Sequence, residues 1–347
     1  MSYPNGRRAL IPVVAVGFAL AAAAAAPARQ LVQASGSHSG LSAAASTRGP
    51  VVRAAAGEST ATILPAEAQP SGIVELTRGW ALAATVATPE GQRAAVLVAE
   101  DGRQRELPRL PGPPVALQER PAPLAVDGQL LGVAWLEGDD YTKLAVRTAE
   151  WDGRGWSPAE TVSLPAHGSQ MALSATLLGD ATPLLVWSRF DGNDDEIVFS
   201  RRNGAGWSPP APIHPVNDVP DILPQVVATP DAGALAVWSE LIDGHYRLLV
   251  SRFDGDAWGM PRRLPGLGAT AARFQIEGAR ALLLYESTEP RIWALAEIDP
   301  SSGRPLRGGQ AVRGSEEAPA IDAGGAALVW PESGRRAALA WQEPANP

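Results

Sequence analysis

The side chains of this chain that could do chemistry gather in the loops between predicted strands, and most of them are acidic. The residue two places after a recurring tryptophan is acidic at Glu137, Glu240 and Glu332. Carboxylates that recur near one rim suit a hard cation such as calcium, which takes several oxygen ligands, or a basic partner. The alternative is that they are ordinary charged hairpin tips. The candidate binding residues are Glu137, Asp140, Arg189, Asp194, Asp195, Glu240, Asp243 and Glu332.

Three of the four histidines, His167, His214 and His245, stand in loops that we expect on the same face. Imidazole suits a transition metal, so the hypothesis is a metal site completed by Asp218 or Asp243. Loops of neighbouring sheets fan apart, however, which works against three histidines reaching one ion. No cofactor follows from these patterns, and calcium is the other candidate ion.

The composition excludes several classes of function. The chain has no cysteine, so disulfides, thiolate metal sites and cysteine nucleophiles are excluded. Its formal net charge is −8, and nucleic-acid binding needs a basic face. We therefore expect no nucleic-acid partner.

The N-terminus has the pattern of a secretory signal. Arg7 and Arg8 precede an alanine-rich apolar run over 9–26, and a site for cleavage between small residues follows at 26–28. The alternative is an uncleaved membrane anchor, which Pro12 and the weak hydrophobicity of alanine disfavour. We expect residues 1–28 to be a signal peptide, the protein to be secreted or periplasmic, and the mature chain to have no membrane span.

Residues 29–70 are rich in alanine, serine, glycine, threonine and proline and show no convincing long period. Such a segment buries too little apolar surface to offset the entropy of ordering it. We predict a low-complexity tether over 29–70.

Aromatic residues then recur at a constant interval. Trp156, Trp207 and Trp258 end three copies of an eight-residue template and lie 51 residues apart. A glycine-flanked acidic turn precedes each member of a second aromatic series. Markers that keep one order and one period indicate a repeated structural unit. The second series is Trp135, Trp187, Trp238, Tyr285 and Trp330.

Each unit has the pattern of four antiparallel strands, A to D. In the best-formed unit they are predicted at 224–229, 234–238, 246–253 and 258–264, with Asp-Gly turns that favour tight hairpins. Four strands in about 40–50 residues are typical of a β-propeller blade. We predict an all-β propeller over 71–347 with about six blades, five or seven being the alternatives. The predicted blades lie near 73–121, 122–169, 170–221, 222–268, 269–315 and 316–347.

The last predicted blade lacks strand D. A strand from the N-terminal side, at 62–64 or 73–76, is expected to fill the gap and cover the open edge.

The eight-residue template resembles the Asp-box of the sialidase-like six-bladed propellers, which has serine, aspartate, glycine and tryptophan at its first, third, fifth and eighth places. Two copies here keep the serine, glycine and tryptophan but carry Asn203 or Asp254 one place late. Family sialidases also use an arginine cluster and a tyrosine nucleophile, and their early Arg-Ile-Pro sequence is absent from this chain. The resemblance therefore implies the fold without the catalytic set. The matching residues are Ser200, Gly204, Trp207, Ser251, Gly255 and Trp258.

Ligands of propellers usually bind on the face that carries the B–C and D–A loops. We expect an exported, non-catalytic binding or scaffold propeller, a monomer, with a protein or glycan of the cell envelope or exterior on that face. One alternative is a sialidase-like glycoside hydrolase or a glycan-binding protein, and another is a subunit of an envelope complex. Trp151 and Trp293 break the aromatic pattern and are either platforms for sugar rings or irregular core residues.

Overall fold

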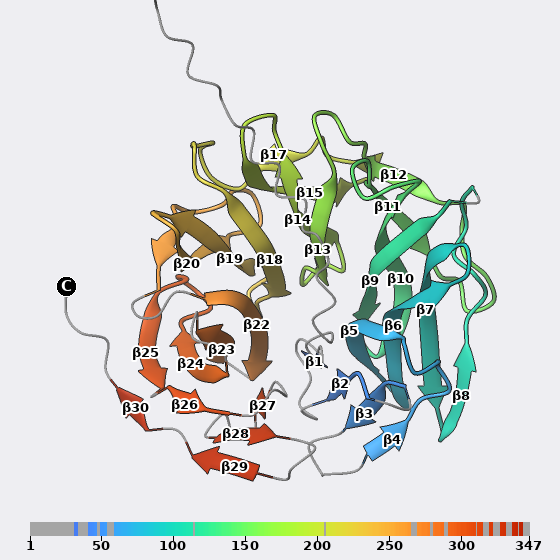
Figure 1. Ribbon diagram of the computed structural model, residues 1–347, viewed down its shortest axis with the longest axis horizontal. Helices are drawn as coiled ribbons and strands as arrows, with labels where there is room; N and C mark the ends of the chain where they lie inside the picture. The colour runs from blue at the N-terminus through green and yellow to red at the C-terminus, as the bar shows by residue number, and fades with distance from the viewer. Residues whose placement is uncertain are drawn as a thin grey trace, which may run out of the picture.

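The computed structural model describes most of the chain beyond residue 30, and every regular element in that part is a strand (Figure 1). No helix there is long and apolar enough to cross a membrane. The predicted signal peptide over 1–28 and Glu332 lie outside the described residues. The described residues are 31–33, 41–46, 49–53, 59–113, 115–204, 206–264, 269–277, 280–287, 291–309, 311–314, 319–321, 327–330, 335–338 and 340–342.

The fold is a β-propeller, as predicted, and the described residues form five complete blades, so the prediction of six was wrong in number. In the third and fifth blades two short strands take the place of strand D. We name each blade by its strands. The first two are β5 (Gln69–Leu76), β6 (Gly79–Thr88), β7 (Gly91–Glu100) and β8 (Arg103–Glu106), then β9 (Leu117–Val126), β10 (Gln129–Gly138), β11 (Ala145–Glu150) and β12 (Glu160–Ser163). The third is β13 (Gln170–Leu177), β14 (Pro183–Phe190), β15 (Asp195–Asn203), β16 (Gly206–Trp207) and β17 (Ala211–Pro212). The fourth is β18 (Asp221–Ala228), β19 (Ala234–Ile242), β20 (His245–Phe253) and β21 (Arg262–Arg263), and the fifth is β22 (Ala269–Glu277), β23 (Arg280–Ser287), β24 (Ile292–Ile298), β25 (Pro305–Gly309) and β26 (Val312–Arg313).

Two further sheets complete the ring seen in Figure 1. One holds β27 (Ala320–Ile321), β28 (Ala327–Trp330) and β29 (Arg335–Ala338), while β30 (Trp341–Gln342) pairs with β25. The other holds β1 (Leu31–Gln33), β2 (Ser42–Ala44), β3 (Val51–Arg53) and β4 (Ser59–Ala61).

The N-terminal sheet corrects two predictions. Residues 29–70 were predicted to be a tether, but β1 to β4 lie within them, and Leu41, Ala43 and Val52 are buried against the β5–β8 blade. A single N-terminal strand was predicted to complete the last sheet, whereas Ala44 of the separate β1–β4 sheet packs against that sheet's core. Short alanine-rich strands are ordered here because neighbouring sheets bury their small side chains.

Several hairpins turn on Asp-Gly pairs, as their sequence predicts. Both residues have positive φ at Asp101-Gly102, Asp127-Gly128 and Asp243-Gly244. Two consecutive left-handed residues make the tight turn whose twist matches that of the flanking strands.

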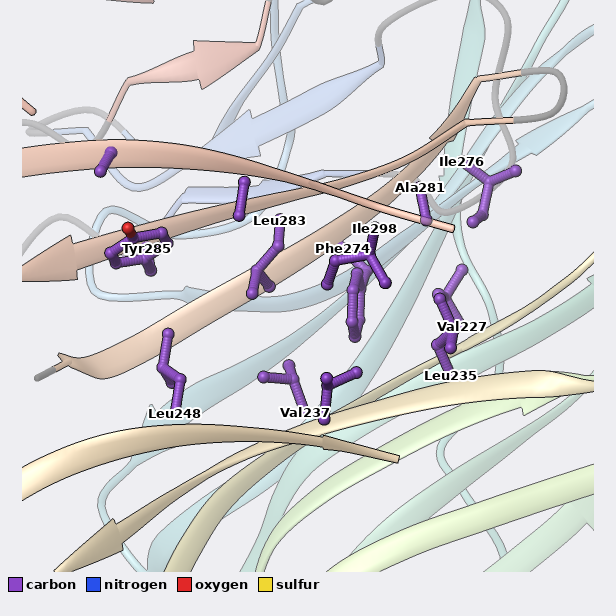
Figure 2. Packing of buried hydrophobic residues seen from close by; sticks show 13 residues of the cluster. Val227, Leu235, Val237, Leu248, Phe274, Ile276, Ala281, Leu283, Tyr285 and Ile298 are labelled. Atoms are coloured by element: carbon purple, nitrogen blue, oxygen red, sulfur yellow. The ribbon is translucent and has the colours of Figure 1, made fainter. Parts of the chain in front are cut away.

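The core lies between the blades, where each sheet buries both faces. Figure 2 shows Val237 and Leu248 of one blade facing Phe274, Leu283 and Ile298 of the next. The central strands are apolar at nearly every position because both of their faces are covered.

The second aromatic series forms the most deeply buried part of this core. Trp135, Trp187 and Trp238 are fully buried, and each donates its indole N–H to a polar side chain. The acceptors are Glu137 at 3.0 Å, Gln170, and Asp221 at 2.8 Å. A buried indole N–H needs such a partner, so the repeat combines a large ring with a polar anchor.

Candidate functional site

A pocket of about 350 Å³ opens between the β9–β12 blade and the β13–β17 blade. Its apolar wall comes from the ends of strands A and B of both blades. Two half-buried tryptophans, Trp151 and Trp207, also line it, and its polar groups come from strand C and the start of strand D. The apolar wall includes Leu124, Leu131, Leu177 and Pro183, and the polar groups are Thr148, Glu150, Ser157, Glu160 and Arg202.

The repeat explains why a pocket forms at this junction. At the next junction, Phe199 and Phe253 occupy the places that Thr148 and Arg202 hold here, 51 residues earlier in each case. The two phenylalanine rings lie 6.0 Å apart by their centroids and pack with Trp258 in the core. Replacing two rings by a short hydroxyl and a charged chain leaves the volume between the blades unfilled.

The polar groups of the pocket hold one another in place. Arg202 Nη1 lies 2.6 Å from Glu160 Oε2, which also accepts the indole N–H of Trp207 at 3.1 Å. Arg202 Nη2 lies 3.4 Å from Glu150 Oε1, and its guanidinium lies over the Trp207 ring at 5.9 Å. The pocket therefore presents one cation and two anions in a preformed arrangement.

Thr148 adds a buried hydroxyl without a partner. The residue lines the pocket, is 5% exposed, and its Oγ1 has no hydrogen-bond partner among the described residues. A buried polar group without a partner destabilises the fold by about 1–3 kcal/mol. The Thr148 hydroxyl therefore costs the ligand-free protein stability, which is consistent with a role in binding a ligand.

This unpartnered hydroxyl gives a testable prediction. Thr148→Val is expected to leave the free energy of unfolding unchanged or raise it by up to about 1 kcal/mol, because it removes an unsatisfied polar atom at nearly constant shape. Denaturant-induced unfolding of the ligand-free protein measures the change. A loss of 1 kcal/mol or more would show that the hydroxyl already has a stabilising partner.

The pocket lies on the face of the A–B and C–D turns, opposite the face of the B–C and D–A loops on which the sequence analysis expected a ligand. Trp151, one of the two proposed sugar platforms, lines the pocket, with its ring centroid 4.8 Å from that of Trp156. Trp293, the other, is 4% exposed and belongs to the core. The sequence analysis did not identify Thr148 and Arg202. The signal for them is that the equivalent positions of the following repeats, Phe199 and Phe253, carry phenylalanine.

The opposite face carries an acidic cluster where the sequence predicted candidate residues. Asp194 ends the loop after β14, Asp195 and Glu196 begin β15, His214 lies in the D–A connection, and Asp221 begins β18. Nε2 of His214 lies 2.8 Å from Asp221 Oδ2 and 3.9 Å from Glu196 Oε2. The His214 ring stacks on Trp238, with 5.4 Å between centroids and 3° between planes.

Burial and mutual repulsion perturb this cluster. Burial, with Asp221 and Asp194 nearby, raises the pKa of Glu196 to about 7, although the backbone N–H of Asn217 opposes the shift. Burial and the neighbouring Asp191 and Asp221 raise the pKa of Asp194 to about 6. Burial works against charging His214, but the close approach and charge of Asp221 outweigh it and raise the histidine's pKa.

The three predicted metal histidines are not brought together. Only His214 joins a group of candidate ligands in the described part of the chain, and its companions are Glu196 and Asp221 instead of Asp218 or Asp243. His167 lies beside the same loop, against Gly192. His245 is exposed at the start of β20.

The remaining predicted binding residues are dispersed. Glu137 is buried and held by Gln118, Trp135 and Arg147, which makes it an anchor of the fold. Glu240 is also buried, with an ion pair to Arg263 at 3.3 Å.

Three others lie outside the acidic cluster or at its edge. Asp140 is exposed, and its hydrogen bonds with Thr142 lower its pKa. Arg189 is half-buried at the end of β14, and Asp243 sits in an exposed turn.

Comparison with known proteins supports the fold alone. No family model matches the chain, and no curated protein matches its sequence. A six-bladed fungal lectin from Aleuria aurantia, described with a fucose recognition mode, is similar with a TM-score of 0.53 and 11% identity, over 81% of this chain and 94% of the lectin. A polysaccharide lyase of family PL25, an ulvan lyase, is similar with a TM-score of 0.54 and 10% identity, over 79% of this chain and 81% of the lyase. The GH93 α-L-arabinofuranosidase of Fusarium graminearum is similar with a TM-score of 0.51 and 11% identity, over 80% of this chain and 93% of the enzyme.

Proposed function

We propose that this protein is an exported saccharide-binding β-propeller, and that the pocket between the β9–β12 and β13–β17 blades binds a neutral sugar without turning it over. One observation carries the proposal: a single preformed pocket combines apolar walls, two tryptophan rings, an Arg202–Glu160 pair and the unpartnered hydroxyl of Thr148.

A sugar ring matches this mixture of surfaces. Its C–H faces are apolar and pack against indole rings such as those of Trp151 and Trp207, while its hydroxyls donate and accept hydrogen bonds at the edge. Arg202 offers donors, Glu150 and Glu160 offer acceptors, and Thr148 offers both. The volume of about 350 Å³ lies at the small end of ligand pockets, which favours one or two sugar units.

The charges favour a neutral sugar over an acidic one. The pocket sets one arginine against Glu150 and Glu160, so its formal charge is negative and it repels a sugar carboxylate or sulfate. The opposite face, where a sialidase would bind its substrate, presents the buried carboxylates of Asp194, Glu196 and Asp221. These observations support sugar binding and disfavour the sialidase alternative.

The groups of the pocket suit binding more than hydrolysis. Arg202 and the indole N–H of Trp207 both contact Oε2 of Glu160, so the fold already uses this carboxylate oxygen as an acceptor. Three fold neighbours are a lectin with a fucose recognition mode, an ulvan lyase and an arabinofuranosidase, so sugar-binding proteins occur among structures of similar architecture.

A saccharide panel tests the proposal directly. The full chain is titrated calorimetrically, and by tryptophan fluorescence, with neutral monosaccharides and disaccharides and with sialosides and uronic acids. We expect at least one neutral sugar to bind, to change tryptophan emission, and to be recovered unchanged. Binding confined to acidic sugars, release of a hydrolysis product, or no binding across the panel would overturn the proposal.

A further inference from the structure

We infer that Glu196, His214 and Asp221 form a binding site for a divalent zinc ion that links the β13–β17 blade to the β18–β21 blade. The site lies on the face opposite the sugar pocket, so this inference does not depend on the proposed function. Ligand atoms of the three residues all lie within 4.8 Å of one another.

The strongest evidence is that each of the three side chains has one heteroatom with a hydrogen-bond partner and one without. Glu196 Oε2, His214 Nε2 and Asp221 Oδ2 are buried atoms that have no partner in good hydrogen-bond geometry. Nε2 and Oδ2 lie 2.8 Å apart, close enough for an ion pair, yet they miss that geometry. These three unsatisfied atoms converge on one point.

The second heteroatom of each residue, by contrast, is bonded. Glu196 Oε1 accepts the backbone N–H of Asn217 at 3.0 Å, and Asp221 Oδ1 accepts the indole N–H of Trp238 at 2.8 Å. His214 Nδ1 lies 2.8 Å from the carbonyl oxygen of Pro215. When Nδ1–H donates to that carbonyl, the lone pair of Nε2 faces the two carboxylates. Outer hydrogen bonds of this kind orient the ligands of protein metal sites.

The ligand types and spacing favour zinc over calcium. Zinc accepts imidazole nitrogen and carboxylate oxygen at about 2.0–2.2 Å, which places tetrahedral ligands about 3.4 Å apart. The distances from His214 Nε2, 2.8 Å to Asp221 and 3.9 Å to Glu196, lie on either side of that value. Calcium prefers six to eight oxygens and would make poor use of an imidazole.

Asp194 adds a third buried carboxylate beside this site. Its side chain is 7% exposed, and neither of its carboxylate oxygens has a partner among the described residues. One of its oxygens lies within 4.8 Å of a Glu196 oxygen. Three buried carboxylates beside one imidazole carry excess negative charge, and a divalent cation neutralises it. Charge and geometry therefore point to the same ion.

The experiment uses the full chain after treatment with a chelator, titrated with zinc chloride by calorimetry and followed by thermal unfolding. Asp221→Asn is the test variant because the amide oxygen still accepts the Trp238 N–H while the anionic ligand is lost. His245→Gln is the matched control, since it removes an exposed histidine outside the cluster.

We expect one zinc ion per chain, a rise of several degrees in the unfolding temperature, and at least a ten-fold weaker affinity in Asp221→Asn with no change in His245→Gln. Thermal unfolding without zinc shows that the variants are folded. A chain that binds no zinc, zinc binding that Asp221→Asn leaves intact, or binding of calcium in preference to zinc would each overturn the inference.

Discussion

Replacing Trp187 with alanine is expected to lower the free energy of unfolding by about 3–5 kcal/mol. The side chain is fully buried between the β9–β12 and β13–β17 blades, so its loss leaves a cavity that rigid sheets cannot close. The change also removes the indole N–H that the Gln170 side chain accepts, and Gln170 is 0% exposed, so water cannot replace this donor. Equilibrium unfolding in denaturant measures the effect.

Trp156→Ala is the control for this prediction. Trp156 is half-buried at the start of strand D, and its indole N–H donates to the carbonyl oxygen of Pro108. We expect a clearly smaller loss of stability from this variant. Equal losses at the two positions would show that both tryptophan series contribute alike to the core.

Thr148→Phe is expected to weaken binding of the neutral sugar identified by the panel at least a hundred-fold. The new ring would occupy the place that Phe199 holds at the next junction, where the volume between blades is filled. The pocket of about 350 Å³ gives that ring room, so we expect the unfolding temperature to stay within a few degrees. Calorimetric titration with the sugar and thermal unfolding provide the two readouts.

Thr142→Phe is the matched control, because it makes the same chemical change on an exposed loop of the opposite face. Its affinity for the sugar should equal that of the unchanged protein. Where Thr148→Phe proves unstable, Trp151→Ala supplies a second test, since it removes an aromatic wall without overfilling the pocket. Full affinity in a folded Thr148→Phe protein would place the sugar elsewhere.

The β1–β4 sheet shows where composition misleads. An alanine- and serine-rich segment looks too weakly apolar to fold by itself, and that inference holds for an isolated chain. Ala43 and Val52 are nevertheless buried, because the faces of the β5–β8 blade and the last sheet are already in place to cover them. Burial supplied by a neighbour cannot be read from the segment alone.

The sequence by itself determined the propeller, because tryptophans and Asp-Gly turns recur at a period that only repeated four-stranded sheets satisfy. It also placed Asp194 and His214 on one face, since the order of strands decides which loops share a rim. The tertiary structure alone decided the two candidate sites. Both lie between blades, where Thr148 meets Arg202 and His214 meets Glu196 and Asp221 across long stretches of chain. The packing of sheets sets those distances, and a linear pattern carries no measure of them.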